Sequence, residues 1–351
     1  MPSPRRRREE EQRRSGILRT LLLIVSGIVM GVALWAYTPD LPRNVLIERY
    51  ANNHSQFIDV GGAKAHVRDE GKADAMPLLM IHGSQGSLQQ WDGWVAALRD
   101  RYRLISVDLP GHGLTGPWPR NEYTIDAYAD FIEVLADALN LDRFAVAGQS
   151  MGGAVAWTFA ATRPERVSEL ILVDSSGYPG EGPTPWSTRL ARMRVLGDIG
   201  IYFKPDYFVR RRLREIYANP AMVTPERVRR VSDLQRFPGN RAATLQRART
   251  QEPLDPSMLR SLDVPTLIIW GAQDRWVPVA DAFHFQRDIA HSHLAIFSKL
   301  GHAPMEEDPK ATAEAVAAFL PTEVPVRAVP PAPPPPSADQ PVPPSIVPEK
   351  E

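Results

Sequence analysis

Continuously apolar runs recur along the middle of the chain, separated by stretches with helical spacing. Such runs are typical of strands in a parallel sheet, which are covered on both faces and lose the usual alternation of polar and apolar residues. Six of them predict strands: LLMIHG (78–83), RLISVD (103–108), FAVAG (144–148), ELILVD (169–174), TLIIWG (266–271) and HLAIFS (293–298). Upstream, QFIDV and KAHVRD flank two glycines and predict a β-hairpin over residues 55–69.

The intervals between these runs carry apolar residues three and four positions apart, as amphipathic helices do. This spacing predicts helices over residues 88–98, 125–139, 152–161 and 311–319. Strands that alternate with helices predict an α/β fold, a doubly wound and mostly parallel sheet. In such a sheet, ligands bind at the carboxyl ends of the strands. We therefore look for candidate chemistry directly after each predicted strand.

The amino end has a different pattern. Six arginines in residues 1–16 precede an apolar stretch whose last 18 residues, 20–37, carry no charge. As a helix, 18 residues reach ~27 Å, close to the ~30 Å thickness of a bilayer core. We predict a basic cytoplasmic tail over 1–16 and a single-pass transmembrane anchor over 17–37, with Trp35 and Tyr37 at the interface. A cleaved secretory signal is the alternative.

The orientation of this anchor follows from its flanking charges. Because the arginines precede the apolar stretch, the positive-inside rule keeps the amino end cytoplasmic and places the catalytic part outside the cytoplasm. Gly27 and Gly31 have the small-xxx-small spacing of paired membrane helices, a spacing that permits weak dimerisation through them.

The remaining segments divide the chain further. Residues 38–55 are expected to form a linker, and residues 56–180 and 251–320 the two parts of an α/β core. Residues 181–250 lie between two predicted strands and are expected to form a helical cap. The end of the chain, 321–351, has 12 prolines in 31 residues and is expected to be disordered.

Charge and composition narrow the function classes. The 41 basic and 41 acidic residues cancel, so nothing points to a nucleic-acid partner. The chain has no cysteine, which excludes disulfides, thiolate nucleophiles and cysteine metal sites. Residues 186–250, however, hold 14 arginines and one lysine against five acidic residues. This excess could guide anionic substrates, contact anionic lipids, or simply form solvated helix faces.

A serine between glycines interrupts the apolar pattern in AGQSMGG (147–153). Ser150 follows a predicted strand and precedes a predicted helix, so it lies at a sharp turn that only small neighbours permit and that exposes its hydroxyl. An ordinary helix N-cap is the alternative reading. A nucleophilic serine needs a histidine base and a carboxylate that orients it. His302 and Asp274 follow the last two predicted strands and are expected at the same sheet edge.

Five motifs, in this order along the chain, resemble the motif set of the α/β-hydrolase superfamily. They are HGSQGS (82–87), DLPGHGLT (108–115), AGQSMGG (147–153), WGAQDRWVP (270–278) and GHAPMEEDP (301–309). The resemblance covers roughly residues 56–180 and 250–320. It implies that Ser150 is the nucleophile, His302 the base and Asp274 the orienting acid. It also implies an oxyanion hole formed by the backbone amides of Met151 and Ser84.

Several other residues have alternative interpretations. Asp174, which ends ELILVD, is a rival for the orienting acid, because some members of the superfamily take it from that strand. The residues of the HG and DLPGHG loops are expected to shape those loops rather than react, namely His82, Gly83, Asp108 and His112. The aromatic residues of the cap region could line an apolar acyl pocket or pack the cap onto the core, namely Trp186, Tyr202, Phe203, Tyr207 and Phe208.

Hydrolysis of carboxylic esters is the expected activity. Epoxide hydrolases and haloalkane dehalogenases have Asp in place of Ser150, and proline iminopeptidases have Trp in place of Met151. HGSQGS also departs from the HGGG of many lipases and esterases, which puts bulky tertiary substrates in doubt. Carbon–carbon bond hydrolysis, lactone opening and a cofactor-free perhydrolase remain alternatives, as does a non-catalytic membrane-tethered binding module.

The expected partners follow from this assignment. They are a small-molecule or lipid-like ester substrate and, through residues 17–37, the membrane. The sequence has no glycine-rich phosphate loop and no HExxH motif, so neither a cofactor nor a metal is expected.

Overall fold

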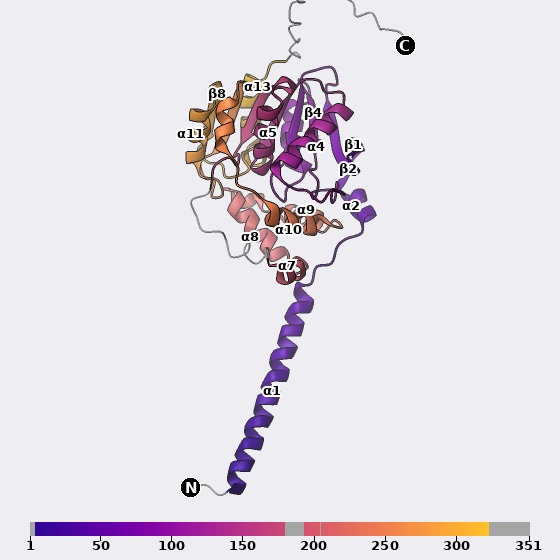
Figure 1. Ribbon diagram of the computed structural model, residues 1–351, viewed down its shortest axis with the longest axis vertical. Coiled ribbons are helices and arrows are strands. Elements are labelled where there is room, and N and C mark those ends of the chain that lie inside the picture. The colour runs from indigo at the N-terminus through magenta and orange to yellow at the C-terminus, as the bar shows by residue number, and fades with distance from the viewer. Residues whose placement is uncertain (1–3, 180–192, 204, 323–351) are drawn as a thin grey trace, which may run out of the picture.

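An eight-stranded sheet forms the centre of the molecule (Figure 1). The computed structural model describes residues 4–179, 193–203 and 205–322. The spatial order of the strands is β1-β2-β4-β3-β5-β6-β7-β8. Their bounds are β1 Ser55–Val60, β2 Ala63–Gly71, β3 Pro77–Ile81, β4 Arg103–Val107, β5 Phe144–Gln149, β6 Val167–Val173, β7 Thr266–Gly271 and β8 Ser292–Phe297.

The predicted α/β fold with a mostly parallel sheet is confirmed. Strands β3 to β8 pair in parallel, whereas β1 pairs antiparallel to β2 and β2 antiparallel to β4. The antiparallel edge is the predicted hairpin, which turns at Gly61 and Gly62, both with positive φ. Each apolar run coincides with a strand. All the residues of β3, β5, β6 and β7 are buried, as expected for strands covered on both faces. Strand β8 differs, because it lies at the edge of the sheet and its residues are only partly buried or exposed.

Helices cover both faces of the sheet. Successive residues of β3 face opposite sides, so Leu79 packs with residues of α4, α5 and α11, and Leu78 with residues of α3 and α13. On the second face, Trp94 of α3 donates its indole N–H to the Thr312 hydroxyl of α13 at 2.9 Å. The bounds are α3 Asp92–Leu98, α4 Ile125–Ala138, α5 Met151–Thr162, α11 Val279–Asp288, α12 Pro304–Glu307 and α13 Pro309–Phe319.

The described chain between β6 and β7 forms four helices, which lie below the sheet in the view of Figure 1. They are α7 Arg194–Gly200, α8 Asp206–Ile216, α9 Pro225–Gln235 and α10 Asn240–Thr250. They occupy the described part of the stretch 181–250 expected to be a cap; residues 181–192 and 204 lie outside the described residues. Val209 and Leu213 of α8 are buried against the sheet core, as is Val228 of α9. These helices, called the insert from here on, therefore pack directly against the core of the domain.

The stretch 38–55, expected to be a linker, contains a short helix, α2 Arg43–Tyr50. Leu46 is fully buried in a small apolar cluster with Leu234 and Phe237 of the insert. The Tyr50 hydroxyl donates to the Asp233 carboxylate at 2.7 Å. This stretch thus ties the amino-terminal segment to the insert rather than leaving it free.

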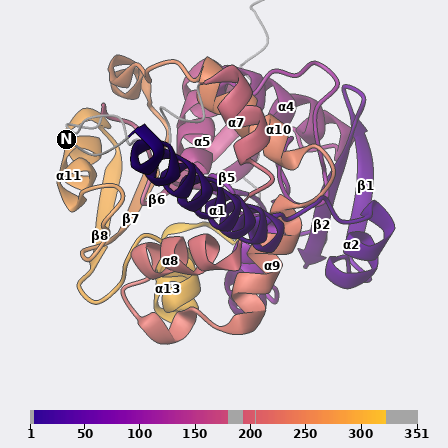
Figure 2. The same ribbon diagram turned by 90° about the horizontal axis from the view of Figure 1, so that it is seen from below.

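A long helix, α1 Pro4–Ala36, projects from the globular part beside α7 (Figures 1 and 2). It includes the described part of the basic tail as well as the predicted anchor. The segment Arg13–Ala36 is long and apolar enough to cross a membrane, with a mean hydropathy of 2.3, and none of it is buried against the protein. A signal sequence would meet the same criteria of length and hydropathy. Residues 323–351 of the proline-rich tail lie outside the described residues.

Candidate active site

Ser150 lies in the turn between β5 and α5, half-buried, with φ 53° and ψ −116°. A non-glycine residue rarely adopts a positive φ, so this turn is strained. Gly148 and Gly152 make it possible, because a Cβ at either position would overlap backbone atoms of the neighbouring turn or of β3 and its following loop. The Ser150 amide donates to Val173 O at 3.0 Å, which ties the turn to β6.

A pocket with a volume of about 80 Å³ opens at this turn. Ser150, His302 and Ser84 line it from the domain, and Arg212 and Tyr217 line it from α8 and its end. The structure thus brings three of the predicted site residues to one cavity beneath the insert. In the described chain there is no hydrogen bond between the Ser150 hydroxyl and the His302 imidazole; such contacts often tighten only when substrate binds.

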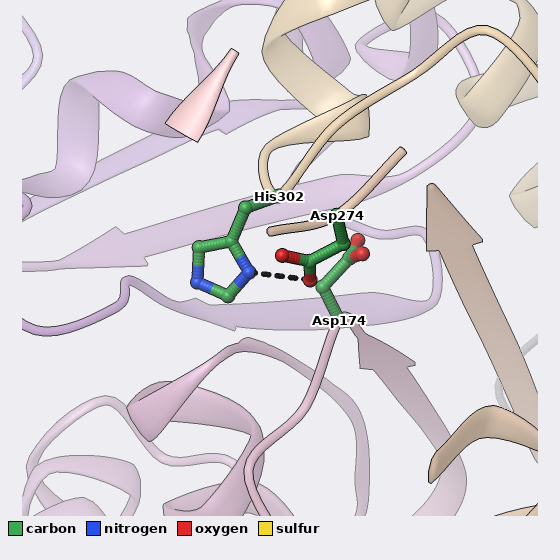
Figure 3. Close-up of side chains that lie close together, drawn as sticks. All are labelled: Asp174, Asp274 and His302. Atoms are coloured by element: carbon green, nitrogen blue, oxygen red, sulfur yellow. Dashed lines mark hydrogen bonds and ion pairs between the residues drawn. The ribbon is translucent and has the colours of Figure 1, made fainter. Parts of the chain in front are cut away.

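His302 is held by Asp274 (Figure 3). The distance from His302 Nδ1 to Asp274 Oδ2 is 2.7 Å, and both side chains are almost fully buried. The other oxygen of Asp274 accepts the amides of Trp276 at 2.7 Å and Val277 at 3.1 Å. With Nδ1 bonded to a carboxylate, the imidazole is held in the tautomer that leaves Nε2 unprotonated.

Three further contacts fix His302, and the sequence did not point to them. Gln149 Nε2 donates to His302 O at 2.8 Å, so the residue before Ser150 holds the histidine loop. The His302 amide donates to Ile216 O of α8 at 2.8 Å. Trp276 stacks on the imidazole, with ring centroids 6.0 Å apart. A polar residue directly before Ser150 was the one visible signal, but its partner is set by the tertiary fold.

Asp174, the rival acid, lies on the far side of Asp274 from His302, and the hydrogen bond to His302 Nδ1 comes from Asp274 (Figure 3). Its Oδ1 accepts the Gly271 amide at 3.0 Å. Burial, followed by the negative charge of Asp274, raises the pKa of Asp174 well above its usual range. Asp174 therefore favours its protonated form more strongly than an ordinary carboxyl group does.

Asp174, Asp274 and His302 offer ligand atoms within 4.8 Å of one another, close enough to surround a cation. The hydrogen bonding argues for a different use. A metal would need His302 Nδ1 and two carboxylates as free ligands, but Nδ1 is bonded to Asp274 and the Asp174 carboxyl favours its protonated form. These donors suit proton transfer better than metal binding.

Two backbone amides are available beside Ser150. Met151 is the first residue of α5, so its N–H has no acceptor within the helix. Ser84 follows the HG pair after β3 and lines the same pocket as Ser150. Neither amide donates a hydrogen bond within the described chain. Both are thus free to bind an oxyanion, the role that the sequence predicts for them.

The residues of the HG and DLPGHG loops lie in a buried network next to the site. Asp108 accepts the amides of Leu88 and Leu114 and bonds His66 Nδ1 at 2.7 Å. Burial opposes the charge of Asp108, but the His66 hydrogen bond and charge outweigh it and lower its pKa to about 2. His82 Nε2 accepts the Leu109 amide at 3.0 Å. These contacts agree with a role in shaping the loops.

The aromatic residues proposed for an acyl pocket are not among those that line the described cavity. Tyr207 and Phe208 are 60% and 47% exposed on α8. Phe203 packs on Tyr37 at the end of α1, and Tyr202 lies against the Arg241 guanidinium. Trp186 lies outside the described residues.

Comparison with known proteins places this geometry in a family. A model of the alpha/beta hydrolase fold matches residues 76–198. A 2-hydroxy-6-oxononadienedioate/2-hydroxy-6-oxononatrienedioate hydrolase of Pseudomonas sp is 30% identical over 265 residues, which are 71% of this chain and 90% of the relative. The chain belongs to the α/β-hydrolase family. The family that the five sequence motifs indicate is thus confirmed.

Two solved structures share the fold. A meta-cleavage product hydrolase from Pseudomonas fluorescens IP01 has 24% identity and a TM-score of 0.65, covering 76% of this chain and 96% of that one. A membrane phospholipase A has 24% identity and a TM-score of 0.63, covering 88% of this chain and 97% of that one. At this identity, the likeness concerns the fold alone.

Proposed function

We propose that this α/β hydrolase cleaves carboxylic esters through an acyl-enzyme, with Ser150, His302 and Asp274 as its triad. The observation that carries the proposal is the 2.7 Å contact between Asp274 and His302 in the pocket that also holds Ser150 at a strained turn. A serine is a weak nucleophile until a base takes its proton, and this base is oriented for that purpose.

In the proposed mechanism, His302 Nε2 takes the Ser150 proton as the serine oxygen attacks the ester carbonyl. The amides of Met151 and Ser84 donate to the resulting oxyanion; one such donor contributes ~3 kcal/mol to lowering the barrier. The imidazolium gives its proton to the departing alcohol, leaving an acyl-serine. Water then attacks with His302 as base again, and the acid is released with Ser150 restored. Asp274 stays ionised throughout and stabilises the imidazolium.

Chain length should decide which esters are accepted. The pocket is far below the ~300–1,000 Å³ of typical ligand sites, so we expect short acyl groups to fit best. Hydrolysis of p-nitrophenyl esters from acetate to palmitate is expected to fall about tenfold or more between butyrate and palmitate. A rise toward palmitate would indicate a lipid substrate and an insert that opens. No turnover of any ester would remove the esterase proposal.

Carbon–carbon bond hydrolysis is the second candidate. The 2-hydroxy-6-oxononadienedioate/2-hydroxy-6-oxononatrienedioate hydrolase of Pseudomonas sp, whose name is typical of that activity, is 30% identical to this chain and aligned over 90% of its own length. The same serine, base and oxyanion hole would serve a vinylogous diketone. To distinguish the two activities, the protein is incubated with a 2-hydroxy-6-oxo-dienoate, and cleavage is followed as the decrease in the visible absorbance of this substrate. Turnover of the dienoate faster than that of every ester would favour the second candidate.

We also propose that α1 is an uncleaved membrane anchor with a cytoplasmic amino end. Its apolar residues are exposed, and further exposed apolar side chains lie on α7 and α8 near the end of α1, among them Val195, Ile199 and Tyr207. Such an exposed surface is unfavourable in water. Because the natural chain has no cysteine, single-cysteine variants can report its topology.

In intact cells, an impermeant maleimide is expected to label Ser257→Cys, on the exposed surface of the domain, and not Ser3→Cys. After carbonate extraction, both single-cysteine variants should remain in the membrane pellet, and both should have the length of the uncleaved chain. The opposite labelling would contradict the orientation, and a soluble, shortened chain would show a cleaved signal.

A further inference from the structure

The arginine Arg212 of α8 lines the pocket beside Ser150. Its Nη2 donates to Ser84 O at 2.8 Å, and its guanidinium lies 5.0 Å from the centre of the Trp276 ring, the ring that stacks on His302. Its Nε and Nη1 are buried without a hydrogen-bond partner. The side chain is thus anchored at one nitrogen, with the rest of its donors unused at the reacting centre.

A second arginine converges on the same residue. Arg247 of α10 donates from Nη2 to the Ser84 hydroxyl oxygen at 2.5 Å, and its Nε is buried and unpartnered. Because Ser84 Oγ accepts this bond, the hydroxyl hydrogen remains free to donate to another group. Two guanidinium groups therefore converge on Ser84: Arg212 lines the pocket itself, and Arg247 lies behind the Ser84 hydroxyl without lining it.

Neither cation has an anionic partner within the described chain. Arg212 and Arg247 form no ion pair there. The pocket does contain one carboxylate, that of Glu306. Its ion pairs are with two other arginines, Arg227 and Arg230, each at 3.6 Å. Burial, and then the nearby Arg247 charge, lower the pKa of Arg212 to about 10, so it stays protonated at neutral pH. Buried charges without a counter-ion are costly, so an anion that bound beside these two cations would offset that cost.

Given the proposed ester hydrolysis at Ser150, we infer that Arg212 and the Ser84 hydroxyl, backed by Arg247, form a subsite for an anionic group of the substrate. The group is a carboxylate or a phosphate carried a few bonds from the scissile carbonyl. The planar fork of a guanidinium matches the oxygens of either. The preferred substrate class is therefore an ester whose acyl part ends in an anion, such as the half-ester of a dicarboxylic acid.

The test compares esters that differ only in this group. Methyl hydrogen glutarate is the carboxylate, methyl 4-phosphonobutanoate the phosphonate, and methyl 5-methylhexanoate the neutral isostere. With full-length wild-type protein, we expect kcat/KM for at least one anionic ester to exceed that of the neutral ester at least tenfold. The arm with the higher value identifies the anion.

Arg212→Gln is expected to lower kcat/KM for the anionic ester about 10- to 100-fold, the range for a lost hydrogen bond to a charged group. The loss on the neutral ester reports only the Arg212 contact to Ser84 O and should be clearly smaller than the loss on the anionic ester. Arg212→Lys should recover part of the loss on the anionic ester. Arg211→Gln is the matched control, because Arg211 is on the same helix with a largely exposed side chain, 68% accessible. Its values should equal those of the wild type for all three esters.

Equal losses on neutral and anionic esters in Arg212→Gln would show that Arg212 only holds the Ser84 loop, and would overturn the inference. So would a wild type that prefers the neutral ester. If no ester at all is hydrolysed, the proposed function fails separately, and the subsite is tested by calorimetry with glutarate and inorganic phosphate. Ser150→Ala should then bind one of them, and the double variant with Arg212→Gln should not; absence of binding in both overturns the subsite.

Discussion

Replacing Ser150 with alanine should lower kcat for p-nitrophenyl acetate by about 10⁴- to 10⁶-fold. Without the hydroxyl no acyl-enzyme can form, and the oxyanion amides alone leave only a small residual rate. The loss corresponds to about 5–8 kcal/mol in the barrier. Initial rates of purified full-length protein, beside the wild type at equal concentration, measure it.

Loss of folding would not explain that result. The Ser150 side chain makes no hydrogen bond within the described chain, and alanine tolerates the turn's positive φ about as well as serine. We therefore expect the melting temperature of Ser150→Ala to stay within a few degrees of the wild type. A folded Ser150→Ala protein that keeps a tenth of the activity or more would show that another group is the nucleophile.

The second large effect separates the two buried carboxyl groups. Asp274→Asn should lower kcat about 10⁴-fold, because an amide NH₂ at this position favours the imidazole tautomer with its proton on the wrong nitrogen. Asp174→Asn is the matched control and should lower kcat less than about tenfold. The raised pKa of Asp174 favours its neutral form, which an asparagine resembles, and the asparagine carbonyl can still accept the Gly271 amide.

Rates of both variants on one ester, with circular dichroism as a folding check, decide between the acids. Larger loss in Asp174→Asn than in Asp274→Asn would transfer the orienting role to Asp174. Equal losses would mean that the two carboxyl groups share a proton and act as one unit, contrary to the separate roles given to them here.

Much of the fold could be predicted because the apolar runs are so regular. ELILVD and TLIIWG became the neighbouring strands β6 and β7, and their carboxyl ends meet at one edge of the sheet. The same adjacency explains why sequence alone left Asp174 and Asp274 as rivals. Both follow the paired strands, and only the path of the loop after β7 brings Asp274, not Asp174, to His302.

Other parts depend on contacts that a linear pattern does not contain. Residues 43–50, RNVLIERY, carry mixed charges and no strong apolar face, so helix α2 is stabilised by the insert on which Leu46 packs. Arg212 and Arg247 were visible only as part of a net positive charge. Their convergence on Ser84 needs α8 and α10 to be folded over the sheet.

The most direct test of Ser150 as the nucleophile is covalent trapping with a fluorophosphonate, followed by mass spectrometry of the digested protein. We predict one adduct, on the peptide that contains Ser150, in the wild type. Ser150→Ala should remain unmodified. Prior incubation with an ester that the enzyme hydrolyses should slow the labelling of the wild type. A wild type that hydrolyses esters while its adduct lies on another residue, or forms nowhere, would contradict the proposed mechanism.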